Sequence, residues 1–266
     1  MSSLPPPAVS PEAYDERYYR ETCAGYEEWA ATDGAGASGV YAGTLEMARF
    51  APGEVVLDLG TGRGELLAVA AERGAARAIG VEYSHDAVRL ARQTLASRGV
   101  EDRCEVVLAD ARDVPLEDGI TDLVTLIDVV EHLTPAELDL ALAQAWRLLA
   151  PSGRLIAHTM PNRTVYEVTY RLQRLTWPPR RRRWPADPRN PYEHRMHVNE
   201  QTVRSLRRAL TAAPFADVEV WTGAMRYADF VPDERARALY WRLAARRPTR
   251  RLGAFDLWAR AVKRGG

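Results

Sequence analysis

Short apolar runs alternate along the chain with longer segments in which apolar residues recur every three or four positions. The first kind of segment predicts buried strands and the second predicts helices, so the alternation indicates an α/β fold with a mostly parallel sheet covered on both faces. The expected strands are residues 55–58, 78–82, 104–110, 121–128, 154–159, 217–222 and 254–262. The expected helices are 65–73, 135–149, 199–210 and 232–247, the last of them an extra helix on the surface.

Two further segments lie outside this alternation. Residues 11–49 predict helices with aromatic side chains at near-helical spacing, which either pack on the sheet or cover a site. Residues 160–198 predict a loop-rich cap without a long helix, because proline breaks helices and this segment has prolines at 178, 179, 185, 188 and 191. Its arginine run, Arg180–Arg183, either grips phosphates and bases or is a solvated basic turn.

The strongest chemical signal is the turn after the first expected strand. Asp58 is followed by Gly60, Gly62 and Gly64, and glycines allow a tight turn and a close approach of the backbone to a ligand. A dinucleotide site favours the spacing Gly-x-Gly-x-x-Gly, which this turn lacks. Asp58 would repel an anionic cofactor and hold a cationic one. The turn therefore predicts S-adenosylmethionine, whose methionyl end carries an ammonium and a sulfonium.

Acidic residues end the first four expected strands. In an open α/β sheet the carboxyl ends of the strands share one edge, where ligands bind. Taken singly, each acid is equally explained as a helix cap or a solvated loop end. Taken together, they predict one site that contains Asp58, Glu82, Asp110 and Asp128. In this site Glu82 accepts hydrogen bonds from the hydroxyls of a ribose.

This pattern resembles the class I S-adenosylmethionine-dependent methyltransferases over about residues 50–160. The segment 58–64 matches the first motif of that family, and Glu82 matches its ribose-binding acid. The resemblance implies that Asp110 and Ala111 contact the adenine and that Asp128 lies beside the sulfonium. The expected cofactor-binding residues are Asp58, Gly60, Gly62, Gly64, Glu82, Tyr83, Asp110, Ala111 and Asp128.

The same resemblance implies an architecture. It is a Rossmann-like, seven-stranded, mostly parallel sheet with an antiparallel last strand and helices on both faces. Residues 1–49 would form an N-terminal helical lid over the cofactor. Residues 50–266 would form the methyltransferase domain, with the cap 160–198 inserted after the fifth strand.

Histidines are the natural candidates for a catalytic base, because methyl transfer to a hydroxyl requires removal of its proton near neutral pH. His132 follows the fourth strand, next to the expected methyl group, and His194 and His197 lie in the cap. These three are the predicted catalytic residues. His85 belongs to the adenosine side, and His158 lies inside the fifth strand, where a structural role is expected.

A metal site is an alternative interpretation of the same residues. The spacing of Asp128, Glu131 and His132, with a histidine some sixty residues later, resembles the Glu-x-x-Glu-His site of the small-RNA 3′-terminal 2′-O-methyltransferases. This chain departs from that pattern, because the shorter Asp128 replaces the first glutamate. Carboxylate and imidazole together suit a divalent ion that grips acceptor hydroxyls. The candidate ligands are Glu131, His132, His194 and His197.

Composition narrows the choice of partners. The chain has 266 residues, 36 basic and 36 acidic side chains and two cysteines. Zero net charge argues against general phosphate binding, but it leaves room for a local basic patch. No apolar run is long enough to span a membrane, and the first eleven residues lack the features of a signal peptide. We expect a cytoplasmic protein without disulfides; the pattern does not indicate its oligomeric state.

The expected function is methyl transfer from S-adenosylmethionine to a hydroxyl of a small polar metabolite, such as a sugar-bearing or natural-product intermediate. A cap that encloses the acceptor favours this small-molecule partner. Metal-dependent 2′-O-methylation of RNA ribose is one alternative, supported by the arginine run. A non-catalytic domain that binds the cofactor and serves as a scaffold is the other.

Overall fold

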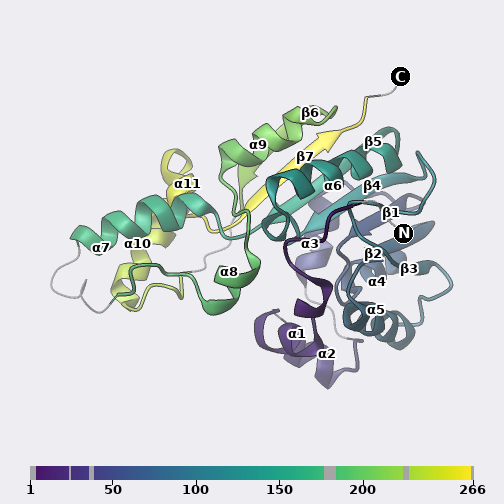
Figure 1. Ribbon diagram of the computed structural model, residues 1–266, viewed down its shortest axis with the longest axis horizontal. Coiled ribbons are helices and arrows are strands. Elements are labelled where there is room, and N and C mark those ends of the chain that lie inside the picture. The colour runs from purple at the N-terminus through teal and green to yellow at the C-terminus, as the bar shows by residue number, and fades with distance from the viewer. Residues whose placement is uncertain (1–3, 24, 36–38, 177–183, 224–227, 265–266) are drawn as a thin grey trace.

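The computed structural model describes residues 4–23, 25–35, 39–176, 184–223 and 228–264. Within these ranges, seven strands form one sheet in the order β3-β2-β1-β4-β5-β7-β6 (Figure 1). The strands are β1 (Val55–Leu59), β2 (Arg77–Glu82), β3 (Cys104–Leu108), β4 (Thr121–Ile127), β5 (Leu149–Thr159), β6 (Ala216–Thr222) and β7 (Leu257–Val262).

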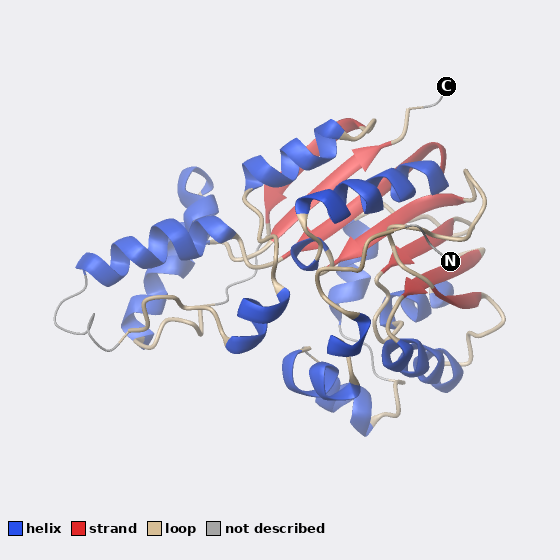
Figure 2. Ribbon diagram, viewed as in Figure 1, coloured by secondary structure: helices blue, strands red, loops and turns tan. Residues whose placement is uncertain are grey.

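The direction of the strands confirms the expected sheet. Strands β1 to β5 pair in parallel, and β7 lies antiparallel between β5 and β6. Helices cover both faces (Figure 2). Apolar side chains from α6 (Pro135–Leu148) and α9 (Val203–Ala212) pack on one face, and side chains from α3 (Gly39–Met47), α4 (Glu65–Glu72) and α5 (His85–Ser97) pack on the other.

A smaller lobe stands beside the sheet, at the end of the molecule opposite β3 (Figure 1). We call it the cap lobe, and define it as residues 160–176, 184–198 and 228–255. It holds a second apolar cluster that includes Tyr166, Tyr170 and Tyr240. The insertion after β5 and the connection between β6 and β7 therefore fold together. Its helices are η3 (Val165–Tyr170, a π-helix), α7 (Arg171–Thr176), α8 (Pro191–Met196), α10 (Glu234–Ala245), η5 (Arg247–Thr249) and α11 (Arg250–Gly253).

Several sequence-based expectations are wrong in detail. The cap does contain a long helix, because η3 and α7 run on without a break over residues 165–176, ahead of the first proline that was held to exclude it. The helix expected from residue 199 begins at Val203, since the Thr202 side chain caps it. The last strand begins at Leu257 instead of residue 254. The segment 232–247 does form a helix, but that helix buries Tyr240 and belongs to the lobe core.

The N-terminal segment is helical, as predicted. Its helices are η1 (Pro11–Ala13), α1 (Glu16–Thr22) and α2 (Tyr26–Ala31). Their buried aromatic side chains pack with residues of α5 and with Met196 of α8. Trp29 also donates a hydrogen bond from Nε1 to the Thr94 hydroxyl, at 2.7 Å. Within the described ranges, no helix combines the length and the apolar character that crossing a membrane requires.

Candidate functional site

The three glycines after β1 differ in how closely their neighbours pack against them. All three have positive φ, between 53° and 79°. A Cβ at Gly60 would lie 2.5 Å from Val129, and one at Gly64 would lie 3.0 Å from Ala91, so these two are required by close packing. A Cβ at Gly62 would meet only the Tyr19 ring, at 3.6 Å. Gly62 is therefore the least tightly packed of the three glycines, and it lies beneath the Tyr19 ring of α1.

Two buried carboxylates flank this turn. Asp58 accepts a 2.5 Å hydrogen bond from the Thr125 hydroxyl, and burial raises its pKa to about 6. Glu82 accepts backbone N–H groups from Gly62 at 3.0 Å, Tyr83 at 2.8 Å and Ser84 at 3.0 Å. Burial raises the pKa of Glu82, although these three donors oppose the rise. Both oxygens of Glu82 are thus fixed at the turn.

The part of the edge that the resemblance assigns to the adenine lies next to a cavity of about 410 Å³, lined by Asp110, Arg112, Asp113 and the segment 4–7. Arg112 holds the Asp110 carboxylate through Nε at 3.0 Å and Nη2 at 2.7 Å. Ala111 follows directly in the chain. Tyr83 ties the N-terminal segment down by donating from its hydroxyl to the Val9 carbonyl at 3.1 Å.

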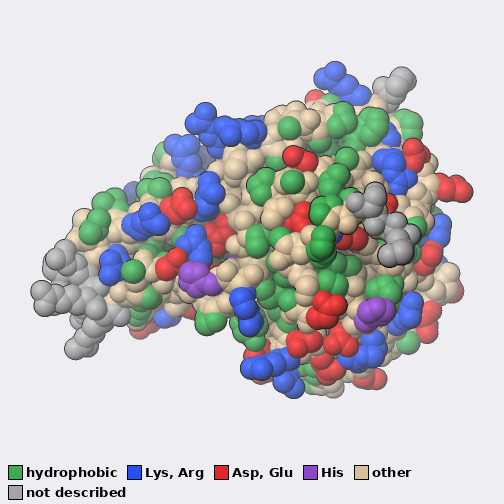
Figure 3. Space-filling view, viewed as in Figure 1, with side chains coloured by type: hydrophobic (Ala, Val, Ile, Leu, Met, Phe, Trp, Pro, Cys, Tyr) green, Lys and Arg blue, Asp and Glu red, His purple; other side chains and the backbone are tan. Residues whose placement is uncertain are grey.

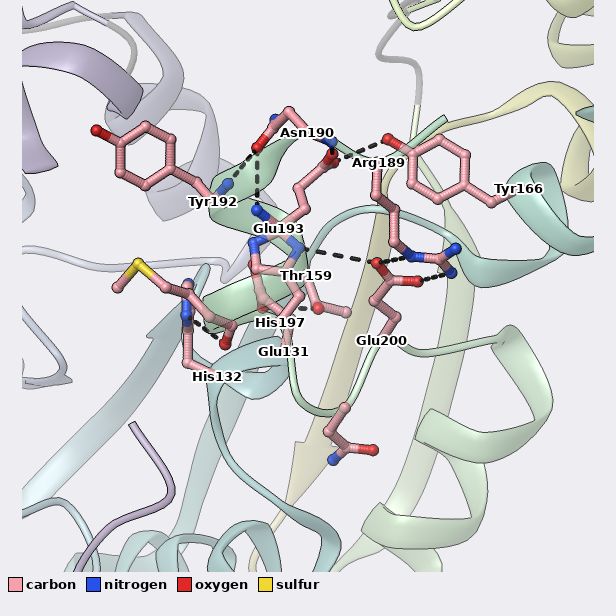
Figure 4. Close-up of polar contacts among 12 residues, drawn as sticks. Glu131, His132, Thr159, Tyr166, Arg189, Asn190, Tyr192, Glu193, His197 and Glu200 are labelled. Atoms are coloured by element: carbon pink, nitrogen blue, oxygen red, sulfur yellow. Dashed lines mark hydrogen bonds and ion pairs between the residues drawn. The ribbon is translucent and has the colours of Figure 1, made fainter. Parts of the chain in front are cut away.

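The acceptor side begins at Asp128, which follows β4 with a φ of 55°. The 3₁₀ turn η2 (Val130–His132) comes next. It places Glu131 and His132 beside His197, with one ligand atom of each within 4.8 Å of the others (Figure 4). We call these three the Glu-His-His cluster. His194 is exposed on α8 and does not join this cluster.

Hydrogen bonds from distant segments position the cluster. His132 donates from Nδ1 to the Met196 carbonyl at 3.2 Å, which leaves Nε2 as the unprotonated nitrogen. Thr159, at the end of β5, donates to the Glu131 carboxylate at 2.7 Å. His197 Nδ1 is buried, has no hydrogen-bond partner among the described residues and lies 3.9 Å from Glu200 (Figure 4).

Burial controls the charge of the Glu-His-His cluster. It lowers the pKa of His132 to about 4. Burial, together with the neighbouring His132, lowers the pKa of His197 to about 3. Burial, and then the Asp128 carboxylate, raise the pKa of Glu131 well above its usual range. Both imidazoles are consequently neutral near pH 7, the state in which they accept a proton or bind a metal.

Another buried histidine, His158, pairs with two carboxylates, one of which is Asp128. His158 contacts Asp128 through Nδ1 at 2.7 Å and Asp256 through Nε2 at 3.5 Å. Burial disfavours the charged imidazole, but the two carboxylates outweigh it and raise the pKa of His158 to about 10. Asp256 also accepts from the Trp258 indole at 2.9 Å. Sequence analysis missed Asp256, and His158 had no visible partner, because the pairing joins residues far apart in the chain.

Tyrosines of the N-terminal helices join the two sides. The Tyr14 ring lies 5.5 Å from Tyr83 on the cofactor side and 5.6 Å from His132 on the acceptor side. Tyr18 packs on both Tyr14 and Tyr19, at 5.1 and 5.2 Å. A continuous aromatic layer therefore covers the edge from the glycine turn to the Glu-His-His cluster.

Comparison with known proteins gives the class of the domain. Residues 56–153 match the family described as methyltransferase domain. The demethylmenaquinone methyltransferase of Thermus thermophilus is 35% identical over 107 residues, which are 40% of this chain and 47% of that protein. The ubiquinone/menaquinone biosynthesis C-methyltransferase UbiE of Teredinibacter turnerae is 26% identical over 174 residues, covering 61% of this chain and 68% of that one.

Solved structures agree on the fold. A phosphoethanolamine N-methyltransferase 2 of Haemonchus contortus, in complex with phosphomonomethylethanolamine and S-adenosylhomocysteine, aligns with a TM-score of 0.65. Its sequence identity is 17%, and the alignment covers 96% of this chain and 61% of that chain. Residues 56–153 thus match a methyltransferase domain, and the whole chain shares the fold of this solved methyltransferase. The chain spans about half the length of the Thermus relative.

Proposed function

We propose that this protein transfers a methyl group from S-adenosylmethionine to a small-molecule acceptor that binds beside the Glu-His-His cluster. The observation that carries the proposal is a pair of buried, neutral imidazoles on the same strand edge as Gly62 and Glu82. The matched domain class supports the cofactor. The buried Glu82 carboxylate and the loosely packed Gly62, beneath the Tyr19 ring, fit its ribose and adenosine.

Each residue of the proposed site has its own role in methyl transfer. When bound, the cofactor supplies an electrophilic methyl group. Glu82 orients the ribose hydroxyls, and Asp128 provides negative charge near the sulfonium. His132 Nε2 accepts the proton of the attacking hydroxyl, because its other nitrogen is held by the Met196 carbonyl. The tyrosine layer excludes water, which strengthens these electrostatic interactions.

A hydroxyl oxygen is the proposed acceptor atom, since a neutral imidazole is suited to removing its proton. A carbon acceptor is the second candidate, because UbiE is named as a C-methyltransferase and the Thermus relative as a demethylmenaquinone methyltransferase. Incubation with labelled methyl donor and a panel of phenols, sugars and quinols tests both. Formation of S-adenosylhomocysteine identifies an acceptor, and NMR of the product assigns the methylated atom. No turnover on any acceptor class, with cofactor binding intact, would favour the scaffold alternative.

Metal binding by the Glu-His-His cluster is a separate proposal. One carboxylate and two neutral imidazoles form a donor set that suits first-row divalent metals, and the Met196 carbonyl orients the His132 ring as outer partners of metal ligands do. The ion would grip the acceptor hydroxyl and would displace the proton that Glu131 otherwise keeps. Calorimetry with Mn²⁺ and chelator-treated protein tests this. Binding should disappear in Glu131→Gln and persist in His194→Ala, which serves as the matched control.

RNA methylation stays an alternative prediction, because Arg180–Arg183 lies outside the described residues. Phosphate-dominated binding weakens steeply with salt. RNA binding at low salt, reduced in both strength and salt dependence by alanine at these four positions, would support this alternative. Absence of binding at low salt would remove it.

A further inference from the structure

Large apolar side chains lie exposed in a line along the η3–α7 helix of the cap lobe. Val168 is 50% exposed, Leu172 59% and Leu175 62%. Their spacing of four and three residues places them on one face of the helix. A single exposed valine or leucine is common. Three on one helix face form a contiguous apolar patch that stays in contact with water in the folded protein.

The opposite face of the same helix makes the lobe core. Tyr166, Tyr170 and Gln173 are buried, and Gln173 donates to the Ala236 carbonyl of α10 at 2.9 Å. Thr169 donates to the Leu252 carbonyl of α11 at 2.6 Å. The helix is therefore fixed on α10 and α11, and its apolar stripe of Val168, Leu172 and Leu175 faces away from them.

The lobe is strongly basic in a chain that is neutral as a whole. Residues 163–176 and 228–253 contain ten arginines and four acidic residues. In Figure 3, the visible surface of the lobe carries basic side chains with hydrophobic and a few acidic ones among them, while acidic side chains gather near α1 and α2. The arginines are Arg163, Arg171, Arg174, Arg235, Arg237, Arg242, Arg246, Arg247, Arg250 and Arg251.

We propose that the cap lobe docks on the surface of an anionic phospholipid bilayer, with the apolar stripe inserted at the boundary between headgroups and acyl chains. A helix with an apolar face and basic flanks binds such a surface through buried apolar area and through attraction to anionic headgroups. Leucine and valine offer no stacking surface for nucleic-acid bases, so the stripe favours a bilayer over RNA.

The docking surface is connected to the Glu-His-His cluster through the chain. Residues 160–198 leave β5 next to Thr159, pass through α7 and return through α8 to His197. The cap insertion thus carries both the apolar stripe and His197 of the cluster. Docking itself is independent of methyl transfer, and its test measures binding alone.

The test is sedimentation of the full chain with vesicles of phosphatidylcholine, or of equal parts phosphatidylcholine and phosphatidylglycerol. The protein should bind the anionic vesicles at least about tenfold more strongly than the neutral ones at low salt, and binding should weaken in 0.5 M salt (~4 Å screening length). Leu172→Ser with Leu175→Ser should lower the partition coefficient at least about tenfold, because both leucines lose their transfer into the apolar boundary. Arg171→Ser should lower it about fivefold.

Matched controls lie outside the lobe. Leu140→Ser on α6 removes an exposed leucine, and Arg92→Ser on α5 removes an exposed arginine, so both should bind as the native protein does. Unchanged melting temperatures would show that the variants fold. The proposal is overturned by equal binding to both vesicle types, or by unchanged binding of the leucine variant. It is also overturned if vesicles are not bound and the stripe instead supports a dimer, seen in light scattering, or RNA binding.

Discussion

The two halves of the strand edge are assembled in different ways. On the cofactor side, Glu82 takes its hydrogen bonds from Gly62, Tyr83 and Ser84, all within 20 residues along the chain. On the acceptor side, His132 is held by Met196, 64 residues away, and Asp128 is linked through His158 to Asp256. The first half is a local motif that any sequence with these strands can form. The second half depends on contacts between remote segments, and its contacts of His132 with Met196 and His197 exist only when the cap lobe has folded against the sheet.

This difference has a functional consequence. The cap lobe supplies His197 and orients His132, yet it does not contact Glu82 in any interaction described above. Changes in the cap are therefore expected to alter acceptor chemistry while cofactor binding stays intact. Changes at the glycine turn are expected to do the reverse.

The largest expected effect concerns the acceptor half. His132→Ala should lower turnover of a confirmed acceptor by about 10² to 10⁴-fold, because it removes the nitrogen that accepts the proton. Affinity for S-adenosylhomocysteine should stay within about twofold, since no cofactor residue changes. Steady-state kinetics and calorimetry measure the two quantities. His85→Ala, an exposed histidine at the start of α5, is the control, and a similar loss of turnover there would contradict the assignment.

The reverse effect is expected at the glycine turn. Gly62→Val should weaken binding of S-adenosylhomocysteine by at least about 10²-fold, because it adds strain at positive φ and fills the face that the ligand approaches. Gly99→Val introduces a similar strain, at a φ of 62°, in open space. Calorimetry should find native affinity in that control. Equal losses in both variants would show that strain alone, and not contact with the ligand, explains the effect.

Stability should depend on pH in two opposite ways within the acceptor half. His132 and His197 have pKa values lowered below the unfolded value of about 6.5, so these two histidines take up protons on unfolding and their contribution to the free energy of unfolding should rise from pH 4 to about 6.5. Glu131, whose pKa burial raises, contributes in the opposite direction with one proton against their two. His158 has a raised pKa of about 10, so its contribution is complete below about pH 6.5 and is lost as the pH rises to about 10.

Denaturant unfolding at pH 5, 7 and 9.5 measures both slopes. His158→Gln should remove an alkaline loss of about 1–3 kcal/mol and leave the acidic slope unchanged. Native protein with no alkaline loss would mean that His158 is not paired with Asp128 and Asp256 as described. His85→Gln, on the surface, should change neither slope.

The smallest effect is expected at the aromatic layer that joins the halves. Tyr19→Ala should raise the dissociation rate of S-adenosylhomocysteine about three- to tenfold, because the ring covers Gly62 and retains the ligand. Tyr26→Ala, in the same N-terminal segment but away from the turn, is the control. Stopped-flow fluorescence would record both, and equal rates in the two variants would remove the lid role of Tyr19.

The contrast also explains what could be predicted from the sequence. The α/β alternation and the mostly parallel sheet follow from the hydrophobic period, the antiparallel last strand was implied by the family resemblance, and these expectations are confirmed. His132 and His197 were predicted as neighbours, and the structure brings them together, whereas His194 lies exposed on α8. The lobe core and the partners Met196, Thr159 and Asp256 left no local pattern, because such contacts depend on how remote segments pack. The long η3–α7 helix was missed because prolines were counted over the whole insertion, although none lies within residues 165–176.

The central claim is that one strand edge places the cofactor on Glu82 and presents its methyl group to the Glu-His-His cluster. A crystal structure of the complex with S-adenosylhomocysteine tests it most directly. The account predicts ribose hydroxyls within hydrogen-bond distance of Glu82 and a sulfur that faces His132 and Asp128. A ribose that does not contact Glu82, or a sulfur that faces away from His132, would contradict it.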